Sequence, residues 1–408
     1  MTRGIQAKRI LVVDDEPMIV SLLSTIFREK GWNVTEAGSG SDGIDKLAQN
    51  PFDVILTDLV MPGDSGIDLL RAAKEVLPDT EVILMTGFAT ADTAIEAMRN
   101  GAFHYIMKPL KAEEVVHLAE KAYEQRMLGR ENRFLKSEIG AAYHVQSLVG
   151  DSEPILRLVE SLQGFAAVDE PVLLCGERGT GRGFFARFIH FNSRRAADLC
   201  VPVHCLGVPT GTLAADLFGR PGNPDDRTSP PRQGKMELAN HGTLYLSDIE
   251  NAGREVLERL ERFLLTKTIL LLGDTVETPM DIRIVASSAV PARELALREN
   301  IPPGLLKAFE HGTVRVPPLR EHREDIPLLL HHFLREANRE RKKPLRGFTA
   351  SALSALEAHD WPGNVRELRD LVGAIASKKK QGTMIDATDI PPAILYRRAR
   401  RPSPGVDP

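Results

Sequence analysis

Five polar side chains stand at the ends of four apolar runs within the first 110 residues. Asp14 and Asp15 follow RILVV, Asp58 follows VILT, Thr86 follows VILM and Lys108 follows HYIM. Clustered carboxylates are the ligands that Mg²⁺ takes when it also contacts phosphate oxygens. Mg²⁺ and the Lys108 ammonium would together offset the charge that develops on a phosphoryl group moving to Asp58. The spacing therefore predicts a site of phosphoryl transfer to an aspartate.

The elements that must position these side chains are the strands of a sheet. Between residues 8 and 125, short β-branched runs alternate with helical patterns, which predicts a parallel sheet of βα units in an α/β fold. The carboxyl ends of parallel strands share one edge, so the five side chains should converge there. Thr86 would hydrogen-bond the new phosphate, and Tyr105 would pack inward behind it as a switch.

A second candidate site is the glycine-rich loop CGERGTGRG at residues 175–183. It follows the strand-like PVLL and precedes the helical FFARFIHFN, which is the context of a phosphate-binding loop. Its glycines after the strand are Gly176, Gly179, Gly181 and Gly183. The motif has lysine and then serine or threonine where this chain has Arg182 and Gly183. Arg182 keeps a positive charge on a wider, planar fork, whereas Gly183 has no hydroxyl group for Mg²⁺.

Composition limits the class of protein. A chain of 408 residues exceeds one ordinary core, so we expect several domains. A formal net charge of -4 gives no reason to expect wholesale nucleic-acid binding. The start of the chain lacks the apolar core of a signal peptide, and no run approaches the roughly 18 apolar residues of a membrane span. We therefore expect a cytoplasmic protein with no membrane partner.

The motifs VVDDE, TDLVMPGDSG, MTG and YIMKP resemble those of the response-regulator receiver family over the first 125 residues. The resemblance implies a CheY-like, doubly wound domain in which Asp58 is the phosphoacceptor for a partner histidine kinase. It also implies a cis peptide bond between Lys108 and Pro109. The implied ligands of Mg²⁺ are Asp14, Asp15, Asp58 and the backbone oxygen of Val60.

The second half of the chain, from about residue 148 to 395, resembles the AAA+ domain of NtrC-type activators of sigma-54 RNA polymerase. The resemblance implies an AAA+ α/β domain with a small helical subdomain, in which Arg366 senses the nucleotide phosphates. The motifs that carry it are LVG at 148–150, LFG at 217–219, GTLYL at 242–246, DIRIVA at 281–286, PPLREHREDIPLL at 317–329 and WPGNVREL at 361–368.

Several chemical positions depart from that family's pattern. Ser247 and Asp248 replace the acidic pair that handles Mg²⁺ and the attacking water, and NPDDRT at 223–228 replaces the loop that touches sigma-54. Pro302 and Ala308 stand where the family has trans-acting arginines. Because each lost charge-stabilising group commonly costs about 10² to 10³ in rate, we predict a pseudo-ATPase and no enzyme activity. Binding of ATP or ADP stays open, since the loop's backbone amides can still cradle a diphosphate.

We predict a response regulator whose AAA+ domain is an interaction or oligomerisation module switched by phosphorylation of Asp58. One alternative is an ATP-dependent sigma-54 activator that acts from solution, and another is a regulator that contacts DNA or polymerase without ATP hydrolysis. The expected partners are a histidine kinase, a second copy of the chain and a downstream protein such as RNA polymerase with sigma-54. The charged segment 111–140 reads as a long helix that either connects the domains or mediates dimerisation.

The expected domain order has five parts. No dedicated DNA-binding domain is expected, because too few residues follow the helical subdomain for the family's helix-turn-helix. The parts are a receiver at 1–125, a helical linker at 126–146, an AAA+ α/β subdomain at 147–322, an AAA+ helical subdomain at 323–395 and a basic tail at 396–408.

Overall fold

The computed structural model describes two compact units, Met1–Ser137 and Glu138–Pro408, which we treat separately. The loop 223–228 and the tail 396–408, singled out in the sequence, lie outside the described residues. The description covers residues 8–395 apart from 88–95, 145–146, 221–232, 271–275, 340, 342 and 380–381, and it leaves out the side chains of 132–135 and 137–139.

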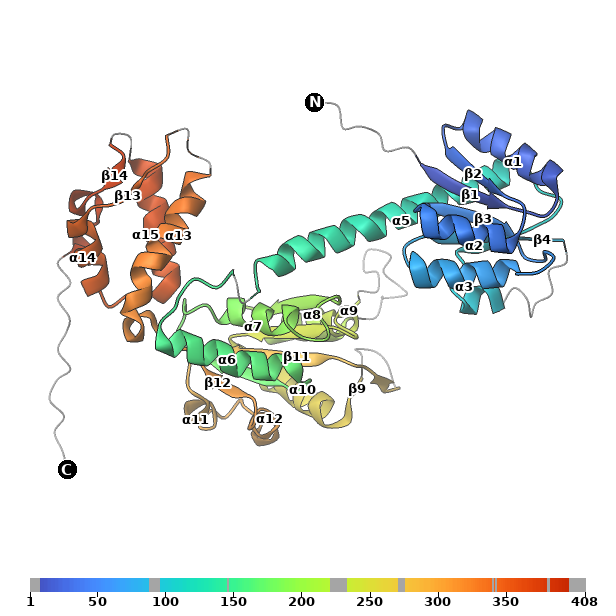
Figure 1. Cartoon of the computed structure of the whole chain (residues 1–408). Coiled ribbons are helices and arrows are strands. Elements are labelled where there is room, and N and C mark those ends of the chain that lie inside the picture. The colour runs from blue at the N-terminus through green and yellow to red at the C-terminus, as the bar shows by residue number, and fades with distance from the viewer. Residues whose placement is uncertain are drawn as a thin grey trace, which may run out of the picture. The chain divides into compact units, whose positions relative to one another are not determined.

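The first unit is built on a five-stranded sheet of order β2-β1-β3-β4-β5 in which every pairing is parallel. Helices lie on both faces of this sheet (Figure 1). The strands are β1 Arg9–Val13, β2 Asn33–Ala37, β3 Val54–Asp58, β4 Glu81–Thr86 and β5 His104–Met107, and the helices are α1 Pro17–Glu29, α2 Gly40–Gln49, α3 Gly66–Val76 and α5 Ala112–Ala141.

Two apolar clusters, one on each face, hold this sheet. Leu47 of α2 and Leu69 of α3 belong to one cluster, and Phe27 of α1 and Ala119 of α5 belong to the other. Alternate residues of the strands feed the two clusters, as the period of two in a buried strand requires. The described helices therefore cover both faces of a doubly wound sheet, and ligands of such sheets bind at the carboxyl ends of the strands.

Local sequence signals explain where the helices of the first unit begin. Pro17 occupies the first turn of α1, where a missing N–H costs nothing. The Ser39 side chain accepts from the Asp42 N–H at the start of α2. At the start of α3, the Ser65 hydroxyl accepts from the Asp68 N–H while the Asp68 carboxylate accepts from the Ser65 N–H.

The segment 111–140 forms a single helix, α5, which spans Ala112–Ala141. Val115 and Ala119 of its first turns are buried against the receiver sheet. Further along, Met127 and Leu128 are exposed. The predicted long helix is thus present. Its two alternative roles, connecting the domains or mediating dimerisation, stay predictions.

The second unit has its own five-stranded parallel sheet, of order β12-β6-β11-β8-β7. Strands β9 and β10, which come between β8 and β11 in the sequence, form a separate short antiparallel pair. The strands are β6 Val172–Cys175, β7 Cys200–His204, β8 Thr243–Ser247, β9 Thr268–Ile269, β10 Thr278–Pro279, β11 Arg283–Ser288 and β12 Thr313–Arg315. The α-helices are α6 Glu153–Ala167, α7 Arg182–Phe191, α8 Thr210–Phe218, α9 Lys235–Leu238, α10 Arg254–Thr266, α11 Ala292–Leu295 and α12 Pro303–Ala308.

Each face of this sheet again packs against its own apolar cluster. Helices α6 and α7 contribute Leu162 and Phe188 to one cluster, whereas α8 and α10 contribute Leu217 and Phe263 to the other. This arrangement of helices on both sides of a parallel sheet is visible in Figure 1. The predicted α/β fold class is confirmed for both units.

A helical subdomain completes the second unit around the buried Trp361. Its helices are α13 Ile326–Asn338, α14 Ala350–Ala358, α15 Asn364–Lys378 and α16 Pro392–Leu395, with a two-stranded pair β13 Gly347–Phe348 and β14 Met384–Ile385. Short 3-10 turns occur at η2 Ile249–Asn251, η3 Leu319–Glu321, η4 Arg323–Asp325 and η5 Ala387–Asp389.

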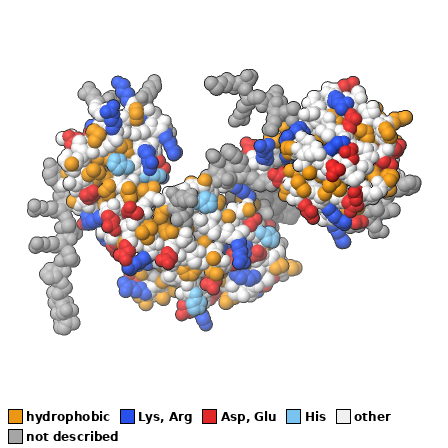
Figure 2. All heavy atoms as spheres, in the orientation of Figure 1, with side chains coloured by type: hydrophobic (Ala, Val, Ile, Leu, Met, Phe, Trp, Pro, Cys, Tyr) orange, Lys and Arg blue, Asp and Glu red, His pale blue; other side chains and the backbone are white. Residues whose placement is uncertain are grey.

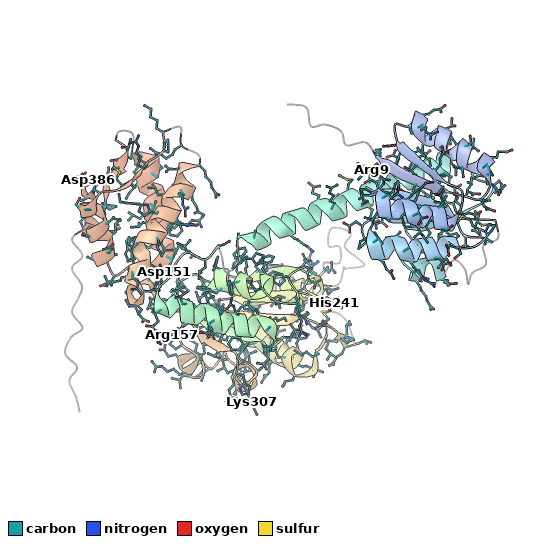
Figure 3. All side chains as sticks on the ribbon, in the orientation of Figure 1. Arg9, Asp151, Arg157, His241, Lys307 and Asp386 are labelled. Carbon is teal, nitrogen blue, oxygen red and sulfur yellow. The ribbon has the colours of Figure 1, made fainter. Side chains whose placement is uncertain are left out.

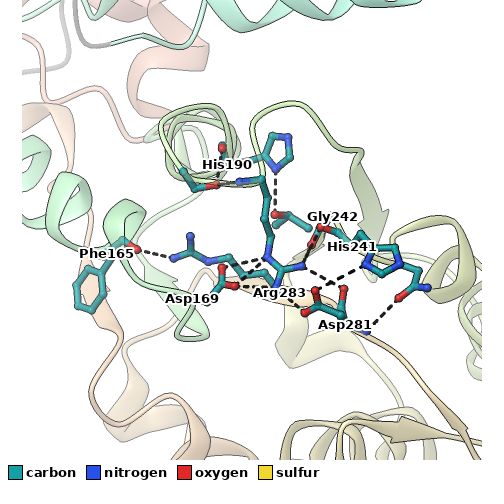
Figure 4. A network of polar contacts seen from close by, with 11 residues as sticks. Phe165, Asp169, His190, His241, Gly242, Asp281 and Arg283 are labelled. Carbon is teal, nitrogen blue, oxygen red and sulfur yellow. Dashed lines mark hydrogen bonds and ion pairs between the residues drawn. The ribbon is translucent and has the colours of Figure 1, made fainter. Parts of the chain in front are cut away.

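A polar network closes the end of the second sheet that lies opposite the glycine loop (Figure 4). The Arg195 guanidinium donates to both carboxylate oxygens of Asp169, to the Asp281 carboxylate and to the carbonyl oxygens of His241 and Asp281. The neighbouring Arg283 is buried and donates to the Phe165 carbonyl oxygen at 2.7 Å. One cation thereby joins three segments at the start of the strands.

The surface carries charges of both signs. Figure 2 shows Lys and Arg side chains interspersed with Asp and Glu on the visible face of both units, in keeping with the formal net charge of -4. Among the described residues, we find no helix that combines the length and the apolar character needed to cross a bilayer.

Candidate functional site

The carboxyl edge of the first sheet gathers the acidic side chains that the sequence singled out. Asp14 and Asp15 follow β1, and Asp58 is the last residue of β3. One carboxylate oxygen from each of these three residues lies within 4.8 Å of the other two. A set of three carboxylates suits a hard divalent cation such as Mg²⁺, so the residues present fit the predicted metal.

Lys108 reaches into the same cluster from the end of β5. Its Nζ lies 2.7 Å from Asp58 Oδ2 and 2.9 Å from Asp14 Oδ2. Burial disfavours the charged ammonium, but the hydrogen bonds to Asp58 and Asp14 outweigh it and raise the pKa of Lys108 above its usual range. Lys108 is therefore a permanent cation beside the Asp58 carboxylate.

Asp14 is the most deeply buried acid of the cluster. Its desolvation raises the pKa of the carboxyl group, although the hydrogen bonds from Lys108 and from the Glu16 N–H lower it. A divalent cation would act in the same direction as Lys108, because positive charge favours the ionised carboxylate. Mg²⁺, when bound, would thus favour the ionised form of Asp14.

Thr86, Tyr105 and Val60 surround the cluster. Thr86 is the last residue of β4 and is buried, and its carbonyl oxygen accepts from the Lys108 N–H. Tyr105 of β5 is partly buried and packs against the apolar cluster of α2 and α3. Val60 is 73% exposed, and its N–H donates to Asp58 Oδ1 at 3.3 Å. The Lys108–Pro109 peptide bond is cis. The roles assigned to these residues from the sequence stay predictions.

One residue of this cluster was missed in the sequence. Glu16 directly follows the aspartate pair, and its Oε1 lies 3.4 Å from Lys108 Nζ. The motif VVDDE contained the signal, because a third acid at the same strand end is within reach of the same cation. Glu16 is largely exposed, so its contribution to the site is screened by solvent.

The second unit contains a cleft of about 630 Å³ at the carboxyl end of its sheet. The glycine loop forms one wall, and the helical subdomain forms another. The predicted site residues that line it are Gly179, Gly181, Arg182, Gly183, Asp248 and Arg366. Gly176 is not among the described lining residues; its N–H donates to the Ser288 carbonyl oxygen and joins β6 to β11. A cleft at this edge is where an open parallel sheet binds its ligand.

Arg182 and Asp248 meet inside the cleft. Arg182 is the first residue of α7, Asp248 directly follows β8, and Arg182 Nη2 donates to Asp248 Oδ1 at 2.8 Å. Only 8% of Arg182 is exposed, and its Nη1 has no hydrogen-bond partner among the described residues. The first residues of α7 line the cleft, and the N-terminus of a helix favours an anion such as phosphate.

The strand before Asp248 carries a second polar pair. The Ser247 hydroxyl and His204 Nδ1 lie 2.8 Å apart, and both residues line the cleft. Towards β11, the other strand that neighbours β8, Tyr245 Oη and Ser287 Oγ are 3.0 Å apart. Burial raises the pKa of Tyr245, so this hydroxyl is a neutral hydrogen-bonding group in the cleft.

The glycine loop is fastened to the helical subdomain. Glu177 binds Arg320 through two hydrogen bonds of 2.8 and 2.5 Å and accepts from Asn364 Nδ2 at 3.1 Å. The Arg366 N–H donates to the Gly179 carbonyl oxygen. The hydrogen bond from Arg320 lowers the pKa of Glu177, so this carboxylate stays ionised. The sequence motifs contained these residues, but their partners lie more than 140 positions away.

The segment before α6 is fastened to the same subdomain. The buried Asp325 carboxylate accepts from the N–H groups of Asp151 and Ser152 and from the Ser152 hydroxyl. Figure 3 labels Asp151 between the sheet and the helical subdomain. The residues that line the cleft just before this point, Ser147–Val149, are thereby held near α13. The cleft therefore has walls from three parts of the unit.

Comparison with protein families matches most of the chain. Residues 10–120 match the response regulator receiver domain, 148–309 match the sigma-54 interaction domain, and 320–405 match the AAA+ ATPase lid domain. The regulatory protein AtoC of Escherichia coli is 32% identical over 386 residues, which cover 95% of this chain and 84% of AtoC. The C4-dicarboxylate transport regulator DctD of Rhizobium meliloti is 32% identical, covering 91% and 80%.

Solved structures give the same result. NtrX from Brucella abortus, crystallised with ADP, superposes with a TM-score of 0.62 at 27% identity and covers 98% of this chain and 87% of NtrX. NtrX crystallised with ATP superposes equally well. A nucleotide therefore binds in a protein with this architecture.

The prediction that the chain is a pseudo-ATPase without enzyme activity is contradicted by these comparisons. The matched domain is an AAA+ sigma-54 activator domain, and NtrX holds ATP and ADP. The prediction counted each replaced side chain as a loss. In the structure, the replacements Arg182 and Asp248 meet at 2.8 Å, so a cation, an acid and the glycine loop all line one cleft.

The predicted domain boundaries stay predictions, but the comparisons establish the family of the chain. A receiver domain, a sigma-54 interaction domain and an AAA+ lid follow one another in this chain, and AtoC aligns with 95% of it. The chain belongs to the NtrC-type family of two-component response regulators, which join a receiver domain to a sigma-54-interacting AAA+ domain.

Proposed function

We propose that Asp58 takes a phosphoryl group from a partner histidine kinase and that this event controls the AAA+ domain. The observation that carries the proposal is the position of Lys108 Nζ, 2.7 Å from Asp58 Oδ2, beside three carboxylates whose oxygens lie within 4.8 Å of one another. An Asp58 oxygen would attack the phosphorus while the donor imidazole leaves. Mg²⁺, when bound, supplies charge neutralisation on the phosphoryl oxygens.

Lys108 contributes in two ways to this transfer. Its ammonium forms an ion pair with the Asp58 carboxylate and so holds a fixed cation beside the acceptor oxygen. It also lies where negative charge develops during transfer, and a fixed cation there lowers the barrier without reorganisation. Thr86, at the end of the neighbouring strand, would hydrogen-bond a phosphoryl oxygen once the group is on Asp58.

The test is phosphorylation of the full-length protein by a small phosphodonor such as acetyl phosphate, with intact-mass measurement. We expect one added phosphoryl group in the wild type and none in Asp58→Ala. Asp64→Ala is the matched control, because Asp64 is an exposed aspartate in the loop that follows β3. Labelling that persists in Asp58→Ala would refute the assignment of the acceptor.

We also propose that the cleft of the second unit binds ATP or ADP. The glycine loop supplies backbone amides, while Arg182 and Arg366 supply positive charge. The ATP and ADP complexes of NtrX support this proposal, and they make ATP turnover the activity to measure. The expected downstream partner is RNA polymerase with sigma-54, by analogy with the sigma-54 activators of the family.

ATP turnover is best measured with the full-length protein at high concentration, with and without beryllium fluoride as a phosphoryl mimic. We expect turnover above that of Arg182→Ala, because this variant loses the cation beside the glycine loop. The same samples report oligomeric state by mass. A change in oligomer mass that the mimic produces in the wild type and not in Asp58→Ala would support control through α5.

A further inference from the structure

We propose that the cleft of the second unit binds its nucleotide without Mg²⁺, and that the Arg182 guanidinium takes the place of the metal. The proposal rests on the nucleotide binding proposed above and concerns the charges that meet the phosphates. Asp248 is a positioning residue in this scheme, because it holds the guanidinium toward the cleft.

Arg182 has the geometry of a prepared phosphate ligand. Its side chain is buried at the first position of α7, and Asp248 engages only one of its two terminal nitrogens. The other nitrogen, Nη1, is buried without a hydrogen-bond partner among the described residues. Buried donors usually have a partner in the protein, in ordered water or in a bound group, and this one belongs to a residue that lines the cleft. A phosphate oxygen is the acceptor that the guanidinium fork matches best.

The same positions offer little to a metal ion. In a phosphate-binding loop, the serine or threonine that follows the lysine gives its hydroxyl to Mg²⁺. In this chain the residue at that position is Gly183. Ser247 at the end of β8 carries no charge and is engaged with His204 at 2.8 Å. The Asp248 carboxylate is neutralised by Arg182. Across the described residues, the only group of three potential metal ligands is the aspartate cluster of the receiver.

The charge of the cleft is sufficient for a polyanion without a cation. Its described lining contains four arginines but only two aspartates, and one of the aspartates is paired with Arg182. The arginines are Arg182, Arg187, Arg366 and Arg369, and the aspartates are Asp248 and Asp370. The excess of fixed positive charge favours a free nucleotide, whereas a bound metal would add a cation beside a guanidinium.

The structure allows the missing metal ligands to be restored. A Cβ atom on Gly183 would meet nothing closer than Tyr245 Oη at 3.5 Å, an ordinary contact, so a serine fits there. An aspartate at position 247 can accept from the His204 ring, whose Nδ1 lies 2.8 Å from the present hydroxyl. The double variant Gly183→Ser/Ser247→Asp therefore gains both ligands, and Gly183→Ala/Ser247→Asn is its matched control of nearly equal shape.

The experiment is calorimetric titration of the full-length proteins with ADP, in EDTA and in Mg²⁺. We expect the wild-type Kd to differ by less than about twofold between the two conditions, and that of Gly183→Ser/Ser247→Asp to fall at least about tenfold with Mg²⁺. The matched control should behave as the wild type. Repeating the titrations with Asp14→Asn separates any effect of Mg²⁺ on the receiver.

Each outcome decides a different statement. A wild-type Kd that falls tenfold or more with Mg²⁺ overturns this inference and leaves nucleotide binding in place. Metal-independent binding with no gain in the double variant overturns the assignment of the effect to Gly183 and Ser247. An absence of ADP binding in both conditions overturns the nucleotide-binding proposal itself, and the inference falls with it.

Discussion

A Cβ atom on Gly66 would lie 2.1 Å from the carbonyl oxygen of Asp58. The first residue of α3 is therefore pressed against the backbone of the proposed phosphoacceptor, and the Gly66 N–H donates to the Leu59 carbonyl oxygen beside it. Because neither partner of this contact is a flexible side chain, a larger residue must move the loop that carries Asp58.

The variant Gly66→Ala should lower both stability and phosphorylation. Forcing an extra carbon into a packed site commonly costs about 1 to 3 kcal/mol. We expect a loss of unfolding free energy in that range by urea titration, together with slower labelling by acetyl phosphate. Gly38→Ala is the control, since a Cβ on Gly38 has nothing within 4 Å. Equal stability of the two variants would show that the loop yields without strain.

The Asp14 carboxyl group gives a prediction about pH. Its folded-state pKa is raised by burial, so the folded protein binds this proton more tightly than the unfolded chain does. Stability contributed by Asp14 is therefore lost as pH rises from the ordinary value of 3.8 through the raised pKa. In metal-free buffer at neutral pH, Asp14→Asn should be the more stable protein, and the difference should shrink as pH falls.

Thermal melts of wild type and Asp14→Asn across pH, with EDTA and with Mg²⁺, test this prediction. Mg²⁺ should stabilise the wild type and have a smaller effect on Asp14→Asn, because the variant lacks one of three carboxylates. A wild type that is more stable than the variant in EDTA at every pH would mean that the hydrogen bond to Lys108 outweighs burial.

The strand ends explain how much of the receiver site could be predicted from the sequence. Asp14, Asp58 and Lys108 each follow an apolar strand, and the parallel sheet brings all three to one edge. Sequence reasoning succeeds there because period and topology alone fix the meeting point. The contact of Lys108 with Glu16 depends on a side-chain rotamer and was not foreseen.

The nucleotide site shows where such reasoning fails. The Arg182–Asp248 ion pair joins positions 66 residues apart on two elements, and neither residue is the usual type at its position. Read one at a time, both substitutions count as losses. The folded structure shows that the longer guanidinium of Arg182 reaches the shorter carboxylate of Asp248. This contact depends on the distance between the two side chains, which the sequence does not give.

The link between Glu177 and Arg320 should influence nucleotide affinity from outside the cleft. Glu177 is in the glycine loop, whereas Arg320 lies in η3 before the helical subdomain. Both side chains are 40% exposed, so we expect a coupling free energy of about 0.5 to 1 kcal/mol between them. A double-mutant cycle with Glu177→Gln and Arg320→Met, read by ADP titration and by urea unfolding, measures it.

The Arg315–Glu321 pair is the control for that cycle, because it is a bidentate pair whose hydrogen bonds do not involve the glycine loop, although its arginine is more exposed, at 67%. Its variants should change stability slightly and leave the Kd for ADP unchanged. Strictly additive effects of Glu177→Gln and Arg320→Met on that Kd would show that their contact does not shape the loop.

Arg195 should prove to be a stability centre at the far end of the second sheet. Its guanidinium is 11% exposed, and removing it deprives Asp169, Asp281 and the His241 carbonyl oxygen of a charged donor at once. Hydrogen bonds to charged groups contribute about 1.5 to 3 kcal/mol, and the exposed acids can recover water. We therefore expect Arg195→Met to lose about 2 to 3 kcal/mol of unfolding free energy.

The neighbouring Arg194 is exposed, so Arg194→Met is the control and should stay within about 0.5 kcal/mol of the wild type. Urea unfolding of the full-length protein should show the loss in the transition of the second unit, with the receiver transition unchanged, because Arg195 contacts only the second unit among the described residues. A loss shared by both transitions would instead mean that the two units unfold as one cooperative block.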